Sequence, residues 1–258
     1  MSEGAEERGA FCLDGEHVLI TGGGTGLGRA AAASAIEAGA TVTLVGRRRE
    51  PLEAACDELG GRAGYAVGDI TADESRRAIV AEAVAGRGPV TVLVNNAGIH
   101  LKQPLASMEI ADLRSVIETH VTAGVALTQL LVPRMMDRGG GTVIFMGSMT
   151  SFIGMPNVVA YSAAKAAVGG VVRSLAVELA SHGVRVNGIA PGWIESPMLR
   201  KALAGDTERE ARILARTPAG RFGAGEDIGR AVVYLASDAG RFVNGVMLPV
   251  DGGALIGF

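Results

Sequence analysis

Tyr161 and Lys165 stand four positions apart in a segment of small residues, so an α-helix would place both side chains on one face. A phenol transfers protons poorly at neutral pH, because its reference pKa is about 10. We expect the Lys165 ammonium to lower the pKa of Tyr161 toward the range that suits general acid–base catalysis. Ser148 follows an apolar strand-like run, and its hydroxyl could hold a substrate oxygen beside Tyr161. The alternative is a chance Tyr-x-x-x-Lys pair on an ordinary helix, with a half-buried Tyr161 and a solvated Lys165.

A glycine-rich turn lies upstream, between an apolar run and a helical pattern. It contains Gly22, Thr25, Gly26, Leu27 and Gly28. The backbone N–H groups of such a turn and the positive end of the following helix can together bind a pyrophosphate. The spacing Gly-x-x-x-Gly-x-Gly differs from the Gly-x-Gly-x-x-Gly of the two-half dinucleotide fold. The turn predicts nucleotide binding, with a purely structural turn as the alternative.

Three arginines follow the second expected strand. A chain that binds NAD would carry an acidic residue there, which would bind the ribose hydroxyls. This chain instead has Gly46, followed by Arg47, Arg48 and Arg49. Guanidinium groups pair with a 2′-phosphate, whereas a carboxylate would repel it. We therefore predict NADP(H) as the cofactor in preference to NAD(H). The alternative is a solvated start to the helix expected near Pro51.

Apolar runs and helical patterns alternate along the chain. The strands are expected at Val18–Ile20, Val42–Val45, Ala63–Val67, Val92–Val94, Val143–Met146, Val184–Ile189 and Val246–Val250. The helices are expected at Leu27–Ala38, Pro51–Leu59, Glu74–Ala85, Ala111–Met136, Ala160–Ala180 and Asp227–Ala236. This alternation predicts an α/β fold with a parallel sheet covered by helices on both sides. Because no Pro/Ser-rich linker divides it, we expect one domain at residues 13–258 after a loose tail at residues 1–12.

Charge and cysteine usage exclude several classes of protein. The formal net charge is −3, from 24 basic and 27 acidic residues, which argues against nucleic acid or an anionic membrane as the main partner. No uninterrupted apolar stretch reaches the roughly 18 residues of a membrane-spanning helix, and the acidic N-terminus carries no targeting pattern. Cys12 and Cys56 make no metal-binding motif, and two such distant thiols indicate a reduced, cytoplasmic compartment.

Five motifs, in this order, resemble those of the short-chain dehydrogenase/reductase family. They are Thr21-Gly22-x-x-x-Gly26-x-Gly28, Asn95-Asn96-Ala97-Gly98, Ser148, Tyr161-x-x-x-Lys165 and Pro191-Gly192. The resemblance covers nearly the whole chain, from about His17 to Gly253. It implies a single three-layer Rossmann-type domain with a doubly wound, seven-stranded parallel sheet. It also implies hydride transfer between a nicotinamide and an alcohol or carbonyl carbon, and usually a homotetramer.

The resemblance further implies where the dinucleotide would bind. Asp69 at the end of the third strand would hydrogen-bond the adenine, with Ile70 next to it at the cofactor. The segment that contains Asn96, Ala97 and Gly98 would pass near the adenosine ribose. Lys165 would bond the nicotinamide ribose hydroxyls, beside Tyr161. The loop after the sixth strand would pack on the nicotinamide through Pro191, Gly192, Ile194 and Ser196. In that loop the backbone of Ile194 and the side chain of Ser196 would reach the carboxamide.

One departure from the family pattern lies in the long helix expected at Ala111–Met136. The family usually has an Asn there, which anchors a water that relays protons to the lysine, and His120 stands in its place. Imidazole both donates and accepts hydrogen bonds, but it titrates near neutral pH. His120 is therefore expected either to serve in the relay as a catalytic residue or simply to pack. His100 is a candidate substrate contact, whereas His17 and His182 are expected to be structural.

Substrate selection is expected in a lid at about residues 193–216 and in the loops after Gly98 and Ser148. The apolar candidates for the pocket are Met149, Phe152, Ile153, Met155, Trp193, Met198 and Leu199. Residues 95–102 and 217–223 resemble sugar-acid members such as gluconate and deoxygluconate dehydrogenases, while the general outline equally resembles 3-oxoacyl-(carrier protein) reductases. We expect a secondary alcohol or ketone as substrate, with a sugar acid or polyol favoured. The non-enzyme alternative is a nucleotide-binding redox sensor, which would typically lack Tyr161 or Lys165.

Overall fold

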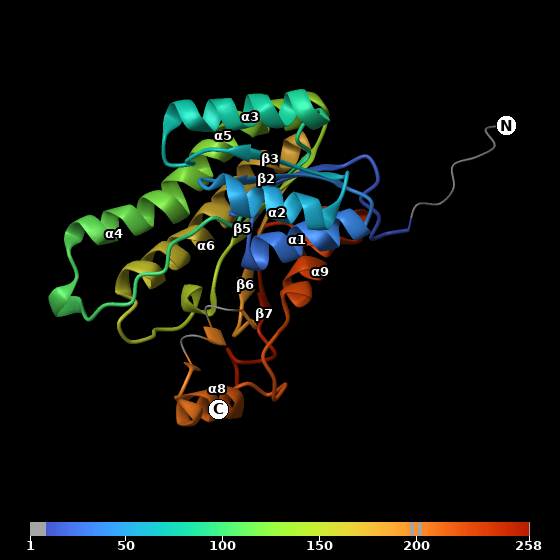
Figure 1. Ribbon diagram of the computed structural model, residues 1–258. Coiled ribbons are helices and arrows are strands. Elements are labelled where there is room, and N and C mark those ends of the chain that lie inside the picture. The colour runs from blue at the N-terminus through green and yellow to red at the C-terminus, as the bar shows by residue number, and fades with distance from the viewer. Residues whose placement is uncertain (1–8, 197–198, 201–202, 258) are drawn as a thin grey trace.

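In the part of the chain that the structure describes, seven parallel strands form one sheet whose carboxyl ends point the same way (Figure 1). The structure is a computed structural model and describes residues 9–196, 199–200 and 203–257. The strand order is β3–β2–β1–β4–β5–β6–β7. The strands are β1 (His17–Thr21), β2 (Thr41–Gly46), β3 (Ala63–Val67), β4 (Val92–Asn95), β5 (Gly141–Met146), β6 (Val184–Pro191) and β7 (Met247–Val250). The chain winds outward in both directions from β1 and β4, which confirms the predicted doubly wound sheet.

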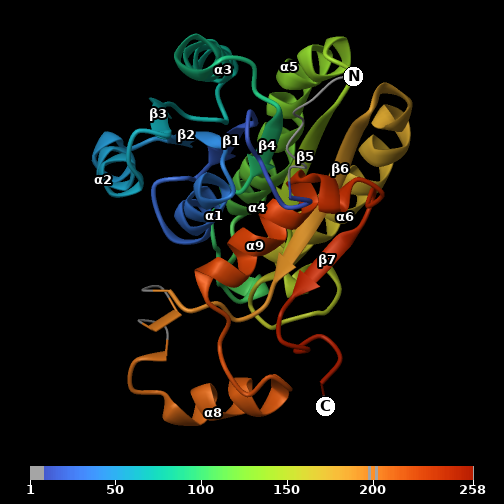
Figure 2. The same cartoon turned by 90° about the vertical axis from the view of Figure 1, so that its right-hand side faces the viewer.

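Helices cover both faces of this sheet and complete the three layers (Figures 1 and 2). One face carries α1 (Gly26–Glu37), α2 (Arg49–Leu59) and α9 (Gly225–Ala236). The other face carries α3 (Asp73–Arg87), α5 (Ala123–Asp137) and α6 (Val159–Leu179). Strands that are covered on both sides must be apolar along their whole length. All five residues of β1 are indeed buried.

The helix expected at Ala111–Met136 is interrupted. α4 (Ile110–Ile117) passes into a π-helical segment at Glu118–Thr122, and α5 continues from it. Such segments are rare and frequently occur at functional sites. This one carries His120, whose side chain is buried. The prediction of one regular helix is therefore corrected at this turn, because apolar periodicity does not distinguish an α turn from a single π turn.

Residues Ile110–Asp137 together are long and apolar enough, by length and composition alone, to cross a membrane. In this fold, the apolar side of that helix packs against the sheet. Leu127, Leu131 and Met135 are each at most 1% exposed and belong to the core between the sheet and α3, α5 and α6. A core helix passes the same test of length and composition, and this helix lies in such a position.

The N-terminal segment joins the fold earlier than expected. The loose tail was expected to extend to residue 12, but the Ala10 carbonyl accepts a hydrogen bond from the backbone N–H of Ala239 at 2.7 Å. The centres of the Phe11 ring and the Tyr234 ring in α9 are 6.3 Å apart. Leu13 is buried. Ala10 and Phe11, which were expected in the tail, thus contact the segment after α9 and α9 itself, whereas the domain boundary at residue 12 stays a prediction.

The segment between β6 and α9 extends beyond the carboxyl end of the sheet and contains α8 (Thr207–Arg216) (Figure 1). A parallel bridge between Ile194 and Gly223 joins the two ends of this segment. The Asp206 carboxylate caps α8 by accepting a hydrogen bond from the backbone N–H of Arg209 at 3.0 Å. The stretch expected as a lid at residues 193–216 thus includes a capped helix, and its role as a lid stays a prediction. Met198, one of the expected pocket residues, lies outside the described residues.

Candidate active site

The three residues expected to carry the chemistry lie together at the carboxyl end of β5. Ser148 follows that strand, while Tyr161 and Lys165 lie one turn apart in α6. The Lys165 ammonium nitrogen is 5.5 Å from the centre of the Tyr161 ring. A side-chain hydrogen bond joins Ser148 and Tyr161. The structure therefore brings together a hydroxyl, a phenol and an amine, as their spacing in the sequence predicts.

Lys165 is unusually well buried for a lysine, with 4% of its surface exposed. Its ammonium donates a hydrogen bond of 2.6 Å to the carbonyl oxygen of Met146, the last residue of β5. Burial lowers the pKa of Lys165 to about 7, because an apolar environment disfavours the charged form. Pocket residues whose pKa is shifted by burial are typical of catalytic sites.

Tyr161 has a different electrostatic environment from the one that we expected. Burial raises its pKa, and the hydrogen bond with Ser148 opposes that shift only in part. The expectation that Lys165 lowers the pKa of Tyr161 is therefore wrong for this structure, in which the ammonium is bonded to Met146 and burial dominates. Tyr161 is accordingly a neutral phenol at neutral pH. Its proton is available to a substrate oxygen.

Ser151 connects the candidate catalytic residues Ser148 and Lys165 and was missed at the sequence level. Its hydroxyl donates a 2.8 Å hydrogen bond to the backbone carbonyl of Lys165 and accepts one of 3.3 Å from the backbone N–H of Ser148. The Ser148 hydroxyl in turn accepts a 3.2 Å hydrogen bond from the backbone N–H of Thr150, which completes a capping box. The pattern Ser-x-x-Ser after a strand was the available signal. One side chain thus ties the end of β5 to α6.

His120 occupies the space next to Gly98. A Cβ atom at position 98 would collide with the His120 ring, so only glycine fits there. The His120 Nε2 atom lies 2.8 Å from the carbonyl oxygen of Ile99 and 3.1 Å from its backbone nitrogen. Its ring meets the Tyr161 ring edge-on, with the centres 5.5 Å apart and the planes at 86°. Burial and the nearby charge of Lys165 lower the pKa of His120 to about 4, and the imidazole is neutral at neutral pH.

His100 is a second imidazole beside the phenol. The centres of its ring and the Tyr161 ring are 5.0 Å apart. His100 is exposed, unlike His120. Burial of part of its ring and the charge of Lys102 lower the pKa of His100. His100 thus lies beside Tyr161, and its contact with a substrate stays a prediction.

The glycine turn after β1 has the close backbone approaches that a bound dinucleotide requires. Gly22 and Gly26 have φ angles of +67° and +53°, which side-chain-bearing residues rarely adopt. A Cβ atom on Gly28 would collide with the carbonyl oxygen of Gly22. Thr25 is the N-cap of α1, with no side-chain capping bond of its own, so the start of the helix is open. This cradle fits a pyrophosphate at the N-terminus of α1.

The Asn95–Gly98 segment braces that turn from the neighbouring strand. The Asn96 side chain donates a 2.9 Å hydrogen bond to the Thr21 carbonyl. The Thr21 hydroxyl accepts bonds of 3.0 Å from the backbone N–H groups of both Asn96 and Ala97. The segment lies between the glycine turn and His120, where the ribose contacts of Asn96, Ala97 and Gly98 were expected.

The expected adenosine end is exposed and positively charged. Arg47 and Arg48 are exposed after β2, whereas Arg49 bonds the Tyr65 hydroxyl at 2.8 Å. The Asp69 carboxylate accepts two hydrogen bonds from Thr71, which lower its pKa, and the charge of Arg47 lowers it further. Arg47 and Asp69 therefore lie within electrostatic reach of each other. Ile70, next to Asp69, is buried and anchors this end of β3.

The loop after β6 closes the other side of the site. A Cβ atom on Gly192 would lie 2.5 Å from the Cα atom of Asp251, so the loop and the end of β7 are in backbone contact. Pro191 ends β6, and Ile194 forms the bridge to Gly223. The Ser196 hydroxyl accepts a 3.1 Å hydrogen bond from the backbone N–H of Leu199. The cofactor contacts expected of Pro191, Gly192, Ile194 and Ser196 stay predictions.

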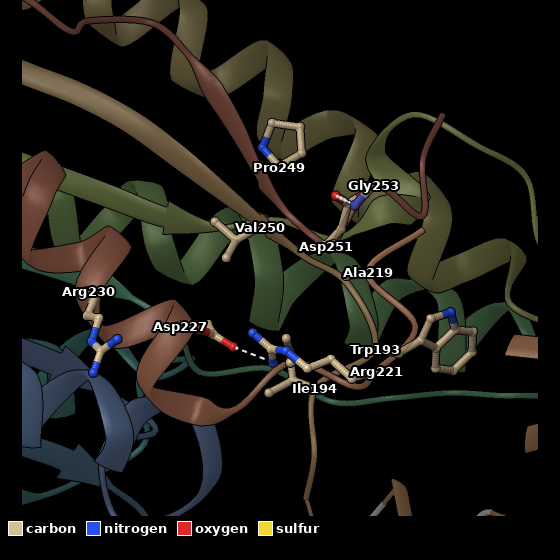
Figure 3. Close-up of a pocket in the computed structure, with 12 residues that line it drawn as sticks. Trp193, Ile194, Ala219, Arg221, Asp227, Arg230, Pro249, Val250, Asp251 and Gly253 are labelled. Atoms are coloured by element: carbon tan, nitrogen blue, oxygen red, sulfur yellow. Dashed lines mark hydrogen bonds and ion pairs between the residues drawn. The ribbon is translucent and has the colours of Figure 1, made fainter. Parts of the chain in front are cut away.

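Two hollows adjoin this loop. The smaller, of about 190 Å³, is lined by Met149, Ile153, Gly154, Met155, Pro156, Trp193, Arg216 and Ala254. Four of the expected apolar pocket residues are among these, whereas Phe152 is 53% exposed and does not line it. The larger, of about 510 Å³, lies by α9 and the end of β7 (Figure 3). There Arg221 and Asp227 form an ion pair at 3.2 Å. Met149 follows Ser148 directly, which makes the smaller hollow the candidate substrate pocket.

Among the described residues, no group of three His, Cys, Asp or Glu side chains could hold a metal ion. The chemistry of the described site is that of a phenol, a hydroxyl, an amine and two imidazoles. Such a set can bind a carbonyl or alcohol oxygen and move a proton to or from it.

Comparison with known proteins agrees with this chemistry. The family model described as enoyl-(acyl carrier protein) reductase matches residues 22–254. Gluconate 5-dehydrogenase from Gluconobacter oxydans is 35% identical, over 95% of this chain and 97% of that protein. The 3-oxoacyl-[acyl-carrier-protein] reductase FabG from Thermotoga maritima is also 35% identical, over 95% of this chain and 99% of that protein.

A solved structure extends the likeness to the fold. Gluconate 5-dehydrogenase from Burkholderia cenocepacia, in complex with NADP and tartrate, superposes with a TM-score of 0.88 at 35% identity. The superposition covers 95% of this chain and 97% of that protein. The matches in sequence and in overall structure each cover almost the whole chain. The chain belongs to the short-chain dehydrogenase/reductase family.

Proposed function

We propose that this protein, an NAD(P)(H)-dependent oxidoreductase of the short-chain family, interconverts the secondary alcohol and ketone forms of a sugar acid or polyol. The observation that carries the proposal is the cluster of Ser148, Tyr161 and buried Lys165 beside a pocket of about 190 Å³. The likeness to gluconate 5-dehydrogenases supports the substrate class. Tartrate in the Burkholderia cenocepacia protein is itself a hydroxy acid, which supports the same class.

The residues divide the work of proton transfer between them. A nicotinamide bound at the carboxyl end of the sheet would supply or accept the hydride. Ser148 and Tyr161 hydrogen-bond the substrate oxygen, so that the reacting carbon is held in one position. In the direction of reduction, the neutral Tyr161 phenol gives its proton to that oxygen. Lys165, with a pKa of about 7, can then carry a positive charge next to the resulting phenolate.

NADP(H) is the proposed cofactor in preference to NAD(H). Arg47 and Arg48 are exposed beyond β2, and Gly46 takes the place of the acidic residue that would bind a free ribose. Arg47 also acts electrostatically on Asp69, which lies at the expected adenine position. NADP in the Burkholderia cenocepacia neighbour supports the same preference.

We propose that His120 takes part in the proton relay to Lys165, at the position where the family usually has an Asn. Its Nε2 atom either donates to the Ile99 carbonyl or accepts from the Ile99 N–H, according to its tautomer. Because its pKa is about 4, it would act as a neutral donor and acceptor rather than as an acid. The edge contact with the Tyr161 ring supports a position within that path.

The alternative activity is that of a 3-oxoacyl-(carrier protein) reductase. The Thermotoga maritima FabG supports this alternative, because its identity to this chain, 35%, equals that of the Gluconobacter oxydans gluconate 5-dehydrogenase. Purified protein should be assayed by nicotinamide absorbance with D-gluconate, 5-keto-D-gluconate, polyols and a 3-oxoacyl thioester. We expect the highest kcat/KM for a sugar acid. A thioester preference would establish the alternative, and binding of NADPH without any turnover would indicate a redox sensor.

A cytoplasmic homotetramer is proposed as the working form. Phe242 and Ile256 near the C-terminus are 100% and 82% exposed in the single chain. Contact with another subunit would remove such side chains from water. Light scattering of the purified protein tests the assembly, and a mass close to that of one chain would contradict it.

A further inference from the structure

The candidate substrate pocket contains one charged side chain. Its lining consists of Met149, Ile153, Gly154, Met155, Pro156, Trp193 and Ala254, together with Arg216. The apolar members come from the loop after β5, from Trp193 at the start of the lid and from Ala254 after β7. Arg216 is the last residue of α8, where the carboxyl end of a helix favours a positive charge. Arg216 is exposed, so its positive charge is open to solvent as well as to the pocket that it lines.

Three of the four acidic residues of the lid form ion pairs with other arginines, and the fourth, Asp206, caps α8. Glu195 and Glu210 pair with Arg200, and Glu208 pairs with Arg212 at 3.1 Å. Within the described part of the chain, no carboxylate forms an ion pair with Arg216. The Arg216 guanidinium is therefore available to an anion that enters the pocket from outside.

We infer that Arg216 binds the carboxylate of the substrate and thereby selects sugar acids over neutral polyols. The inference rests on the proposed function. The substrate oxygen at Ser148 and Tyr161 would mark the reacting carbon, and the carboxylate would lie at the far end of the pocket. A guanidinium is suited to this role because it forms two parallel hydrogen bonds with a carboxylate. Arg216 is thus a specificity residue that acts through binding and takes no part in proton transfer.

The pocket supplies its own reporter of binding. Trp193 lines it and is the only tryptophan in the chain. The experiment titrates wild type, Arg216→Ala and Arg216→Lys with D-gluconate and follows Trp193 fluorescence. Sorbitol, a neutral polyol, serves as the second ligand. Arg212→Ala is the matched control, because it removes the same charge from the same helix outside the pocket.

We expect Arg216→Ala to weaken D-gluconate binding and to raise its KM by about ten- to a hundredfold, as loss of a charge-assisted bond predicts. The kcat should change by less than about twofold, since the change affects binding alone. The KM of Arg216→Lys for D-gluconate should lie between those of the wild type and Arg216→Ala, because an ammonium keeps the charge but cannot form the two parallel hydrogen bonds. The KM and the fluorescence titration for sorbitol should be the same in the wild type and all the variants. Arg212→Ala should match the wild type for both ligands.

Two failures can be told apart. If the wild type oxidises D-gluconate and Arg216→Ala has the same KM and the same fluorescence titration, the role of Arg216 is overturned while the proposed function stands. If the wild type neither binds nor oxidises any sugar acid, the proposed function itself is wrong and the inference falls with it. An equal loss for D-gluconate and sorbitol would show that Arg216 shapes the pocket without recognising charge.

Discussion

The candidate catalytic end of the site and the expected adenosine end differ in burial and in hydrogen bonding. At the catalytic end, Lys165 is 4% exposed, its ammonium is bonded to Met146, and its carbonyl is bonded to Ser151. At the adenosine end, Arg47 and Arg48 are exposed. The N-cap residues of α1 and α2 make no side-chain hydrogen bond to their helices. One end depends on fixed, buried side chains, and the other depends on backbone shape and solvated charge.

The difference reflects what each end must do. Proton transfer needs donors and acceptors whose positions and pKa values are set in advance, which burial and hydrogen bonds provide. Binding of a phosphate needs positive charge and backbone N–H groups, and these work well at a solvated surface. Substitutions at the catalytic end should therefore change kcat and pH dependence, whereas substitutions at the adenosine end should change cofactor affinity and choice.

The largest effect is expected from Tyr161→Phe. Removing the proton donor should lower kcat by about a thousandfold or more, while NADP binding stays within about twofold because the glycine turn is untouched. Steady-state kinetics would measure kcat, and calorimetric titration would measure the affinity for NADP. Tyr234→Phe, which removes a phenol hydroxyl far from the cleft in α9, is the control. A near-normal kcat of Tyr161→Phe would contradict the assignment of Tyr161 as the proton donor.

The next effect concerns pH. The pKa of His120 is about 4 in the folded protein against an ordinary 6.5, so the unfolded chain binds the proton more readily. The contribution of His120 to stability is therefore constant above about pH 6.5 and falls as the pH drops toward 4. Between about pH 7.5 and pH 5, the wild type should lose about 2 kcal/mol more of its free energy of unfolding than His120→Asn.

Urea unfolding of both proteins at the two pH values tests this prediction. Equal pH dependence would show that His120 is not buried in its neutral form. We also expect His120→Asn to keep at least about a tenth of the wild-type kcat, because an amide donates and accepts hydrogen bonds as a neutral imidazole does. Its pH–rate profile should shift. Complete loss of activity with the fold intact would mean that an Asn cannot replace this histidine.

At the adenosine end, Arg47→Ala should lower the ratio of kcat/KM for NADP to that for NAD by about tenfold, since one charge-assisted contact with the 2′-phosphate is lost. The kcat with saturating cofactor should remain unchanged. Arg49→Ala is the matched control, because the Arg49 guanidinium is already bonded to Tyr65. A ratio that is the same in the wild type and Arg47→Ala would argue against recognition of the phosphate.

The smallest effect is expected from Ser151→Ala. Loss of the bonds that join Ser148 to the Lys165 carbonyl should lower kcat by about three- to tenfold, as one neutral hydrogen bond predicts. Cofactor affinity should not change. Ser162→Ala is the control, since the buried Ser162 hydroxyl has no hydrogen-bond partner among the described residues. Equal activity of the two variants would show that Ser151 does not position the site.

Much of the fold was readable from local pattern. The continuous apolar runs of the strands and the helices between them predict a covered parallel sheet, because only buried strands are apolar on both faces. Tyr161, Lys165 and Ser148 were readable too, since spacing on a helix and position after a strand are local properties. The π segment at His120 and the packing of Phe11 were not, because both depend on residues distant in the sequence.

The sequence by itself determined the order of strands and helices, the glycine turn and the identities of the reacting groups, all of which depend on neighbours along the chain. The tertiary structure alone decided the charges of those groups. It raised the pKa of Tyr161, lowered that of Lys165 to about 7 and that of His120 to about 4. Burial and contacts such as that of His120 with Gly98 arise only when distant segments meet, because a pKa depends on the solvent and charges around a group.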